Sequence, residues 1–488
     1  MTETAKKKRG MPSSFTILLA LLAIVAVITV IVSGTSGGAV TAARLSDFCT
    51  APILGFADAL PVCLFVMILG GFLGMMTETG ALDNGIAVLV QKLKGNEIML
   101  VPVLMLIFSL GGTTYGMCEE TVPFYALLAA TMMAAGFDPM VGAATVLLGA
   151  GCGCLGSTVN PFAVGAAVDA LTGVGIEVNQ SIIIGLGAVL WIVTTAISIF
   201  FVMGYAKKVK ADKGSTILSM QELKDAEEAH GKAASEVNKE VKLTGRQKGV
   251  LIAFVVMIVG FIPLADLNEG VANFFDAGAV YDADGNTVVQ GWSALITGLP
   301  IGQWYFDEAS TWFFLMAILI GIIGGLSEKQ IVNTFITGAA DMMSVVLVIA
   351  LARGISVLMA NTGLDVYVLD AAASALAGLS GVIFAPMSFL VYFGLSFLIP
   401  STSGMATVSM PIMGPLAVKL GFSPEVMVMI FSAAIGVVNL FTPTSGAIMG
   451  GLALAKIEWT TWLKFALKLI VVLSVVCAII LTVACVLI

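Results

Sequence analysis

Charge and histidine are both scarce in this chain. Only 11% of its 488 residues are charged and a single residue is histidine, whereas 59% are hydrophobic. So little charge leaves no basic surface for a nucleic-acid partner, and a mean hydropathy of +1.04 excludes a soluble globule. Many apolar stretches reach about 20 residues, the length that spans a bilayer. The composition therefore predicts an all-α polytopic membrane protein that contacts membrane lipid.

The sequence also lacks the residue clusters of metal, disulfide and enzyme chemistry. The seven cysteines lie mostly in apolar runs, Cys152 and Cys154 have neither a zinc nor a redox spacing, and His230 lies in a charged linker. No nucleophile–base pair indicates a membrane enzyme, and no nucleotide-binding motif indicates a primary pump. We therefore expect no catalytic residues, no metal-ligand cluster and no organic cofactor.

Lysine and arginine predict the orientation of the chain, because these residues concentrate in cytoplasmic loops. Four of them occupy positions 6–9 and ten lie within 205–248, whereas 265–309 contains none. This distribution predicts a cytoplasmic N-terminus and linker, an outer loop at 265–309 and an extracytoplasmic C-terminus in a bacterial inner membrane. Lys419 falls on the predicted outer side, against the rule.

An internal repeat is the main organising feature. Residues 57–80 align without a gap with 340–363 at an offset of 283 (position 341 against position 58), and Gly136–Pro139 matches Gly421–Pro424. Counting the predicted spans from the cytoplasmic N-terminus gives the two copies opposite directions. Inverted repeats of this kind place a transport site near the membrane midplane, where helices are broken.

These boundaries divide the chain into five segments. They are an N-terminal segment with the first transmembrane helix (1–36), a first repeat with hairpin one and a broken helix (37–204), a cytoplasmic charged linker (205–248), two connecting helices with the loop 265–309 (249–327), and a second repeat with hairpin two and a broken helix (328–488). Within them we expect surface segments at 80–94 and 364–378, a solvated helix at 220–231 and a β-hairpin at 280–289.

Hairpin one, at about 97–135, carries the sharpest clue to the solute. The predicted binding residues at its tip are Thr113, Thr114, Gly116, Glu119 and Glu120. Adjacent carboxylates are costly in lipid unless a partner or solute meets them, and irregular backbone at membrane depth needs protein or a water-filled cavity around it. The tip therefore predicts a re-entrant hairpin whose carboxylates meet a cationic solute, a proton or Na⁺. The structural alternatives are an ion pair with Arg353 and exposure to water at the cytoplasmic face.

Polar residues also interrupt two apolar helices and fill the tip of hairpin two. The predicted binding residues are Ser157, Thr158 and Asn160 in the first helix, Asn439, Thr442, Thr444 and Ser445 in the second, and Ser401, Thr402 and Ser403 in the tip. Proline beside each interruption removes a backbone donor, and the exposed helix ends would bind a solute or a cation. Na⁺ is expected near Ser157, Asn160, Thr442 and Ser445. A proline kink satisfied by its own hydroxyls is the alternative.

Three further charged residues lie within the repeats. Asp58 and Asp341 occupy matching positions, where we expect each carboxylate to cap the start of a helix. Arg353, the one arginine within a predicted span, would either form an ion pair or bind a substrate carboxylate.

Three motifs resemble those of a known family. Thr113–Phe124, Gly156–Pro161 and Pro400–Gly404 are similar to segments of the YfcC-type membrane proteins. That family, provisionally named as basic amino acid antiporters, belongs to the C4-dicarboxylate anaerobic carrier (DcuC) group of the ion-transporter superfamily. The resemblance covers nearly the whole chain. It implies a scaffold and a mobile transport domain that work as an elevator, and a homodimer.

We therefore predict a secondary active transporter that exchanges or imports basic amino acids such as arginine and ornithine. Its small-molecule solute would move on a gradient of solute, Na⁺ or H⁺. A carrier of C4-dicarboxylates or other organic anions, coupled to Na⁺ or H⁺, is the nearest alternative, because the same group contains such carriers. Inverted repeats with re-entrant hairpins would also permit a channel.

Overall fold

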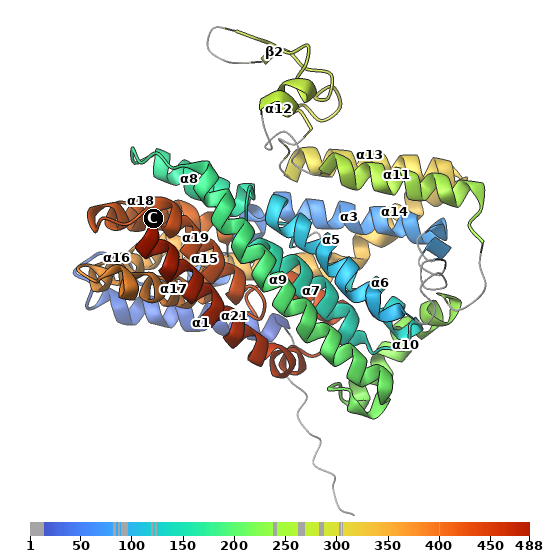
Figure 1. Cartoon of the computed structure of the whole chain (residues 1–488), viewed down its shortest axis with the longest axis horizontal. Helices are drawn as coiled ribbons and strands as arrows, with labels where there is room; N and C mark the ends of the chain where they lie inside the picture. The colour runs from blue at the N-terminus through green and yellow to red at the C-terminus, as the bar shows by residue number, and fades with distance from the viewer. Residues whose placement is uncertain are drawn as a thin grey trace, which may run out of the picture.

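The computed structural model describes residues 14–81, 84–85, 88, 96–118, 121–122, 124–237, 242–261, 269–282, 287–301, 304, 306–399 and 401–488. Most of them are helical, which confirms the all-α prediction (Figure 1). The first half contains α1 (Ser14–Ser33), α2 (Leu45–Asp58), α3 (Leu60–Glu78), η1 (Glu97–Met99), α5 (Leu100–Tyr115), α6 (Phe124–Ala134), α7 (Pro139–Leu155), the π-helical turn η3 (Pro161–Gly165), α8 (Ala166–Thr172), α9 (Gln180–Ala211), η4 (Lys213–Ser215) and α10 (Met220–Val237).

The second half continues in the same manner. It contains α11 (Gly245–Phe261), α12 (Glu269–Phe275), β1 (Val280–Tyr281), β2 (Thr287–Val289), α13 (Phe306–Gly324), α14 (Glu328–Asp341), α15 (Met343–Thr362), α16 (Leu364–Leu376), α17 (Gly381–Leu398), α18 (Thr402–Lys419), α19 (Pro424–Val438), α20 (Gly446–Leu454) and α21 (Trp459–Leu487). Helix α16 occupies the expected surface segment 364–378, whereas most of the segment 80–94 lies outside the described residues.

Several helices are built to meet lipid. Six of the described helices are long and apolar enough to cross a membrane, namely α3, η1 with α5, α9, α13, α15 and α21. Their outward faces carry large apolar side chains, such as Phe200 on α9, which is 76% exposed. Such faces would be costly in water but contact hydrocarbon favourably in a bilayer. The fold is therefore that of a multi-pass membrane protein.

Two pairs of helices cross at glycine contacts. Helix α3 packs against α14 and α2 packs against α15. A Cβ on Gly55 would lie 2.3 Å from the backbone nitrogen of Gly354, and one on Gly338 would lie 2.4 Å from the carbonyl oxygen of Gly70. Small residues let membrane helices approach to backbone distance. The crossings join segments that are almost 300 positions apart in the chain.

Asp58 and Asp341 do not cap helix starts, so that prediction was wrong. They are the last residues of α2 and α14. Ala59 and Met342 occupy the N-cap positions of α3 and α15, and neither forms a side-chain cap hydrogen bond. The reason is that the chain is already helical before each aspartate and breaks for a single residue after it.

A second set of helices surrounds the two interruptions. Helices α5 and α6 pack against α7, and α17 and α18 pack against α19. Helix α7 ends at Leu155 and the chain becomes helical again at Pro161, whereas α19 ends at Val438 and α20 begins at Gly446. The predicted breaks near Ser157–Asn160 and Thr442–Ser445 are therefore present.

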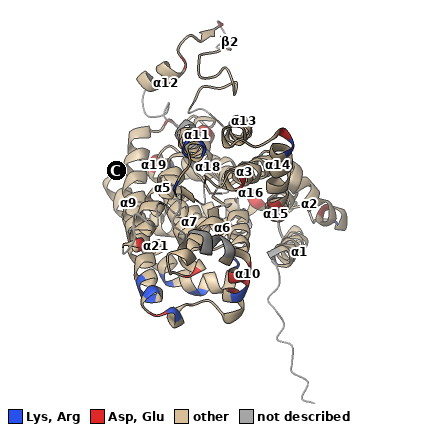
Figure 2. Cartoon of the chain, turned by 90° about the vertical axis from the view of Figure 1, so that its right-hand side faces the viewer, with Lys and Arg blue, Asp and Glu red and all other residues tan. Residues whose placement is uncertain are grey.

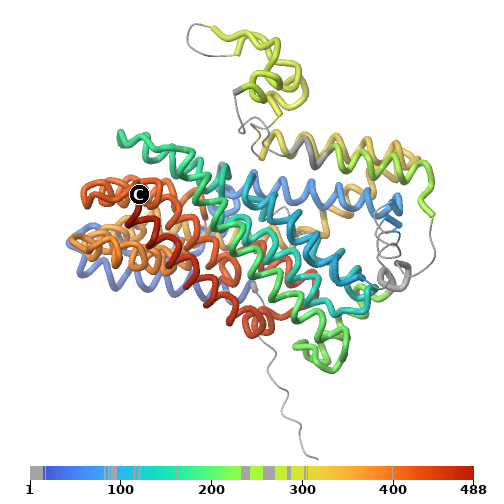
Figure 3. Tube along the Cα trace, viewed as in Figure 1, coloured from blue at the N-terminus to red at the C-terminus, as the bar shows by residue number. Residues whose placement is uncertain are grey.

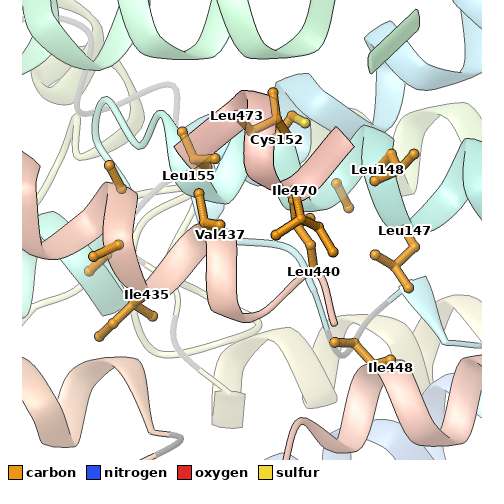
Figure 4. Close-up of a cluster of buried hydrophobic side chains, with 14 of the residues drawn as sticks. Leu147, Leu148, Cys152, Leu155, Ile435, Val437, Leu440, Ile448, Ile470 and Leu473 are labelled. Atoms are coloured by element: carbon orange, nitrogen blue, oxygen red, sulfur yellow. The ribbon is translucent and has the colours of Figure 1, made fainter. Parts of the chain in front are cut away.

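The core of this set lies where α7, α19 and α21 meet (Figure 4). Leu155 of α7, Val437 of α19 and Leu473 of α21 belong to this core, and all three are fully buried. Around them the buried residues form the largest apolar cluster in the described part of the chain. This packing fixes the ends of both interrupted helices relative to each other.

The polar loops lie far apart. Figures 1 and 3 show α12 and β2 projecting at the top, beyond the paired α11 and α13, and Figure 1 places α10 at the lower right. Strands β1 and β2 pair antiparallel, which confirms the predicted β-hairpin; the turn at 283–286 lies outside the described residues.

The helix predicted at 220–231 is present as α10 and most of its described side chains are exposed, but it is not solvated on every side. It runs from Met220 to Val237, and both Glu222 and His230 on it are buried. Glu222 Oε1 accepts a hydrogen bond from the Glu458 backbone nitrogen at 2.9 Å. His230 Nε2 lies 3.0 Å from the Leu454 carbonyl oxygen. The helix is therefore docked on the α20–α21 connection.

Candidate functional site

A cavity of about 140 Å³ lies where the interrupted helices meet the start of α18. Its walls come from residues on both sides of the two interruptions, from the first turn of α18 and from one side of α15. Eight predicted binding residues line it: Gly116, Asn160, Ser401, Thr402, Ser403, Asn439, Thr444 and Ser445. The fold thus brings together polar residues from two halves of the chain.

The start of α18 supplies three of these residues. Ser401 is the N-cap, and its Oγ accepts a hydrogen bond from the Gly404 backbone nitrogen at 3.1 Å. This bond satisfies one of the backbone donors that every helix start leaves open. Thr402 and Ser403 follow on the cavity wall. The cavity therefore borders the positive end of a helix dipole.

The interruption between α19 and α20 is supported by tryptophans of α21. The indole Nε1 atoms of Trp459 and Trp462 donate hydrogen bonds to the carbonyl oxygens of Phe441, at 2.7 Å, and Leu440, at 2.8 Å. These bonds satisfy backbone acceptors that the break releases from helical bonding. The irregular backbone is therefore stabilised from outside the cavity.

Residues within this interruption divide into two groups. Asn439, Thr444 and Ser445 line the cavity. Thr442 does not line it; its buried hydroxyl lies 2.7 Å from the hydroxyl of Thr444. We therefore assign Thr442 to support of the break.

The interruption after α7 is held by its own side chains. Ser157 Oγ donates to the Cys154 carbonyl oxygen at 2.6 Å and accepts from Asn160 Nδ2 at 2.9 Å. Asn160 Oδ1 accepts from the Phe162 backbone nitrogen at 2.9 Å, where the chain becomes helical again. Ser157 therefore satisfies the local backbone, as the kink alternative describes, whereas Asn160 also borders the cavity.

Thr113 ties the end of α5 to this interruption. Its Oγ1 donates to the Gly156 carbonyl oxygen at 2.6 Å, and its own carbonyl accepts from the Thr158 backbone nitrogen at 2.9 Å. Gly116 ends α5 with φ +80, and a Cβ there would lie 2.4 Å from Asn160 Oδ1. Thr114 Oγ1 donates to the Leu110 carbonyl oxygen at 2.7 Å, away from these contacts. Of Thr113, Thr114 and Gly116, only Gly116 lines the cavity.

Glu119 and Glu120 lie outside the described residues. Their role as carboxylates for a cation, and the alternative ion pair with Arg353, therefore stay predictions. The described partner of Arg353 is Asp58, with Nε 2.9 Å from Oδ2. Arg353 itself lines the cavity.

The four residues predicted to bind Na⁺ differ in their surroundings. Asn160 and Ser445 line the cavity, whereas the hydroxyls of Ser157 and Thr442 are engaged in hydrogen bonds within the chain. Na⁺ at this position stays a prediction.

Several lining residues carried no polar signal in the sequence. Gly151 and Gly436 line the cavity one turn or less before the interruptions, and a Cβ on Gly436 would lie 2.4 Å from the Leu155 Cα. Glycine shortly before each break was the available clue to this close crossing. Phe306 also lines the cavity, but it begins α13, far from either interruption in the chain, and no sequence pattern singles it out.

A polar cavity within a bundle of apolar, lipid-facing helices is the arrangement of a membrane transporter. Sequence comparison gives the family: the model of the C4-dicarboxylate anaerobic carriers (DcuC) matches residues 39–486. The chain therefore belongs to the DcuC family, whose members are transporters rather than enzymes.

Two relatives and one solved structure are similar to this chain to different degrees. A Haemophilus influenzae protein is 29% identical over 441 residues, covering 90% of this chain and 78% of its own length. An Escherichia coli protein, provisionally named basic amino acid antiporter YfcC, is 27% identical over 436 residues, covering 87% of this chain and 77% of its own length. MtrF of Neisseria gonorrhoeae, described with a class of antimetabolite efflux pumps, is 18% identical with a TM-score of 0.47 over 98% of this chain and 96% of its own.

Proposed function

We propose that this protein is a secondary active transporter of the bacterial inner membrane that exchanges or imports basic amino acids such as arginine and ornithine. The observation that carries the proposal is the cavity, which gathers Ser401–Ser403 and Asn439, Thr444 and Ser445 around helix starts and ends. Membership of a transporter family and similarity to a relative named for basic amino acids support it.

The proposed binding mode uses both charges of the solute. The first turn of α18 and the hydroxyls of Thr402 and Ser403 would hold the α-carboxylate, because a helix start attracts negative charge. Glu119 or Glu120 would hold the cationic side chain, since an unpaired carboxylate at membrane depth is costly. A gradient of the exchanged solute, of Na⁺ or of H⁺ would drive the cycle.

The proposed architecture is a pair of inverted repeats with two re-entrant hairpins, α5–α6 and α17–α18. Packing supports it, because α1 contacts α15 as α13 contacts α3, and α8 contacts α18 as α6 contacts α20. Equivalent helices thus exchange partners, as a twofold relation between repeats requires. On this arrangement we propose elevator motion of the cavity-bearing helices and a homodimeric assembly.

A carrier of C4-dicarboxylates or other organic anions is the second candidate. Two observations favour it: the family takes its description from such carriers, and an arginine lines the cavity. In that case the carboxylates of hairpin one would be structural or would exchange protons.

Counterflow in proteoliposomes of the purified full-length chain separates the candidates. Vesicles loaded with arginine should accumulate labelled arginine, and external ornithine, but not succinate, should chase it. Accumulation of labelled succinate without arginine exchange would establish the anion carrier instead. Single-channel current in the same membranes would indicate a channel.

The carboxylates have their own test. Glu119→Gln and Glu120→Gln together should lower arginine exchange at least about 10-fold, because loss of one member of a buried charge pair is expensive. Unchanged exchange of every solute would remove these residues from the site. Empty vesicles and the exposed Lys464→Gln variant provide the controls.

A further inference from the structure

One guanidinium lies beside the cavity on an apolar helix that is long enough to cross a membrane. Arg353 stands near the middle of α15, a 20-residue apolar helix, and its side chain is 23% exposed. A charged side chain in such a position is costly unless it is paired or serves a water-filled pathway. Arg353 is paired with Asp58 and also lies on the cavity wall, so both explanations for a charge here apply to it.

Asp58 contacts only one of the three guanidinium nitrogens. Asp58 Oδ2 contacts Nε at 2.9 Å, and among the described residues it is the one acceptor that pairs with Arg353. Among the residues that the structure describes, none accepts from the N–H groups of either Nη atom, which leaves room there for a planar, two-pronged acceptor. Arg353 Nη1 lies 4.0 Å from the Cβ position of Gly404, in the first turn of α18. An open edge of the guanidinium therefore borders a helix start of the same electrostatic sign.

Two positive groups that border one cavity favour an anion between them. A carboxylate matches the fork of the Nη donors and also accepts from helix-start N–H groups. Without a shared anion the two positive groups would repel each other. The geometry thus favours one carboxylate rather than a second cation beside Arg353.

The Asp58–Arg353 pair is also held in place by close packing. One residue beyond Arg353, a Cβ on Gly354 would lie 2.7 Å from the Ala51 carbonyl oxygen, so α2 and α15 touch at this point. Contact of this kind fixes the backbones of α2 and α15, which carry Asp58 and Arg353, relative to each other.

The other crossing shows that the helices need no ion pair to pack. At the repeat-equivalent position of Arg353 stands Gly70, and a Cβ there would lie 2.5 Å from the Gly338 carbonyl oxygen. The α3–α14 crossing is thus as close as the α2–α15 crossing without an arginine at that place. A purely structural role leaves the single, cavity-facing arginine unexplained.

We infer that Arg353 binds a carboxylate of the transported solute and that Asp58 is a positioning residue that aims the guanidinium at it. The inference rests on the proposed function as a transporter of small organic solutes. It concerns the carboxylate shared by amino acids and dicarboxylates, so it holds for either candidate solute class.

Competition in the counterflow assay tests the inference. Arginine and argininamide share the cationic side chain, but only arginine has the carboxylate. Wild-type protein should prefer arginine to argininamide at least about 10-fold, the range for a charge-assisted hydrogen bond. Arg353→Gln should raise the KM for arginine about 10- to 100-fold and abolish the preference. Arg353→Lys, which keeps the charge without the fork, should fall between.

Asp58→Asn tests positioning separately. It should reduce the arginine-to-argininamide preference and raise KM with little change in kcat, because the guanidinium remains but loses its orientation. The exposed Lys464→Gln on α21 serves as the matched loss of one positive charge and should leave both values unchanged. Size-exclusion profiles identify any variant that misfolds. If Arg353→Gln misfolds, the KM values and carboxylate preferences of Arg353→Lys and Asp58→Asn test the inference in its place.

The outcomes separate this inference from the proposed function. If arginine is not exchanged but succinate is, the basic amino acid proposal fails, and succinate against its monoamide replaces the arginine pair. If Arg353→Gln or Arg353→Lys keeps wild-type KM and full preference for the carboxylate form, the inference is overturned, whichever solute is transported.

Discussion

Glycine at the helix crossings sets how closely α2 and α15 approach. A Cβ on Gly55 would lie 2.3 Å from the Gly354 nitrogen and 2.4 Å from the Ala350 carbonyl oxygen. Both neighbours are backbone atoms, so no side-chain rotation relieves the overlap. We therefore expect Gly55→Ala to force the helices apart and to destabilise the protein by about 1–3 kcal/mol, the usual effect of overpacking. Thermal unfolding of the purified protein in detergent measures it.

Gly394 provides the matched control. It lies within α17, and a Cβ there would meet nothing within 4 Å. Gly394→Ala should leave the unfolding temperature unchanged or raise it, because alanine restricts the unfolded chain. Equal unfolding temperatures for both variants would show that the α2–α15 crossing has room for a methyl group at position 55.

At the scale of single residues, the sequence predicted part of the site. Hydroxyls and amides at two helix interruptions indicated where the cavity lies, and Asn160 and Ser445 do line it. Sequence could not tell Thr442 from Thr444, two residues apart, because irregular backbone has no fixed period of side-chain direction. The carbonyl oxygens just before them are held by the tryptophans of α21, which follow more than 14 positions later.

At the scale of elements, α10 is docked through two ionisable side chains, Glu222 and His230. His230 is buried against the Leu454 carbonyl oxygen, and burial lowers the pKa of its imidazole. Hydrogen bonding to that carbonyl raises the pKa, whereas Lys456 nearby lowers it further. Because the pKa in the docked state lies below its ordinary value of 6.5, docking prefers the neutral ring. Its contribution is complete above that value and is lost as pH falls.

We therefore expect α10 to loosen on acidification. Hydrogen exchange of its backbone amides, corrected for intrinsic rates, should rise several-fold between about pH 7.5 and pH 5.5. His230→Gln can still donate to the Leu454 carbonyl but does not titrate at this position, so its exchange should rise much less on acidification than that of the wild type. A wild-type helix that exchanges equally at both values would contradict the role of His230.

Elements were predicted well where periodicity was strong and poorly where tertiary contact decides. The long apolar helices and the breaks in two of them follow from composition and proline. The docking of α10 does not, because its polar sequence matches a solvated helix. The contacts of Glu222 and His230 with the Glu458 and Leu454 backbone depend on the folded chain. The sequence did not predict α2 and α14 as separate helices, because each has 14 residues, too few for a span.

At the scale of the whole molecule, charge is distributed unevenly. Figure 2 shows lysine and arginine at the bottom, around α10 and the neighbouring helix ends, and also on α11 and α14, whereas the part with α12 and β2 shows none. Basic residues accumulate on the cytoplasmic side of membrane proteins. Charge and shape together therefore support the proposed orientation, with the linker inside and the β-hairpin outside.

Cysteine labelling of intact cells tests this orientation. Lys224 on α10 and Val288 on β2 are exposed, so each can be replaced by cysteine in a background that carries Cys49→Ser. A membrane-impermeant maleimide should label Val288→Cys in intact cells and Lys224→Cys only after permeabilisation. Labelling of both from the same side would make the two repeats parallel. Parallel repeats could not face their interruptions from opposite sides of the bilayer, and alternating access through the shared cavity would then lose its structural basis.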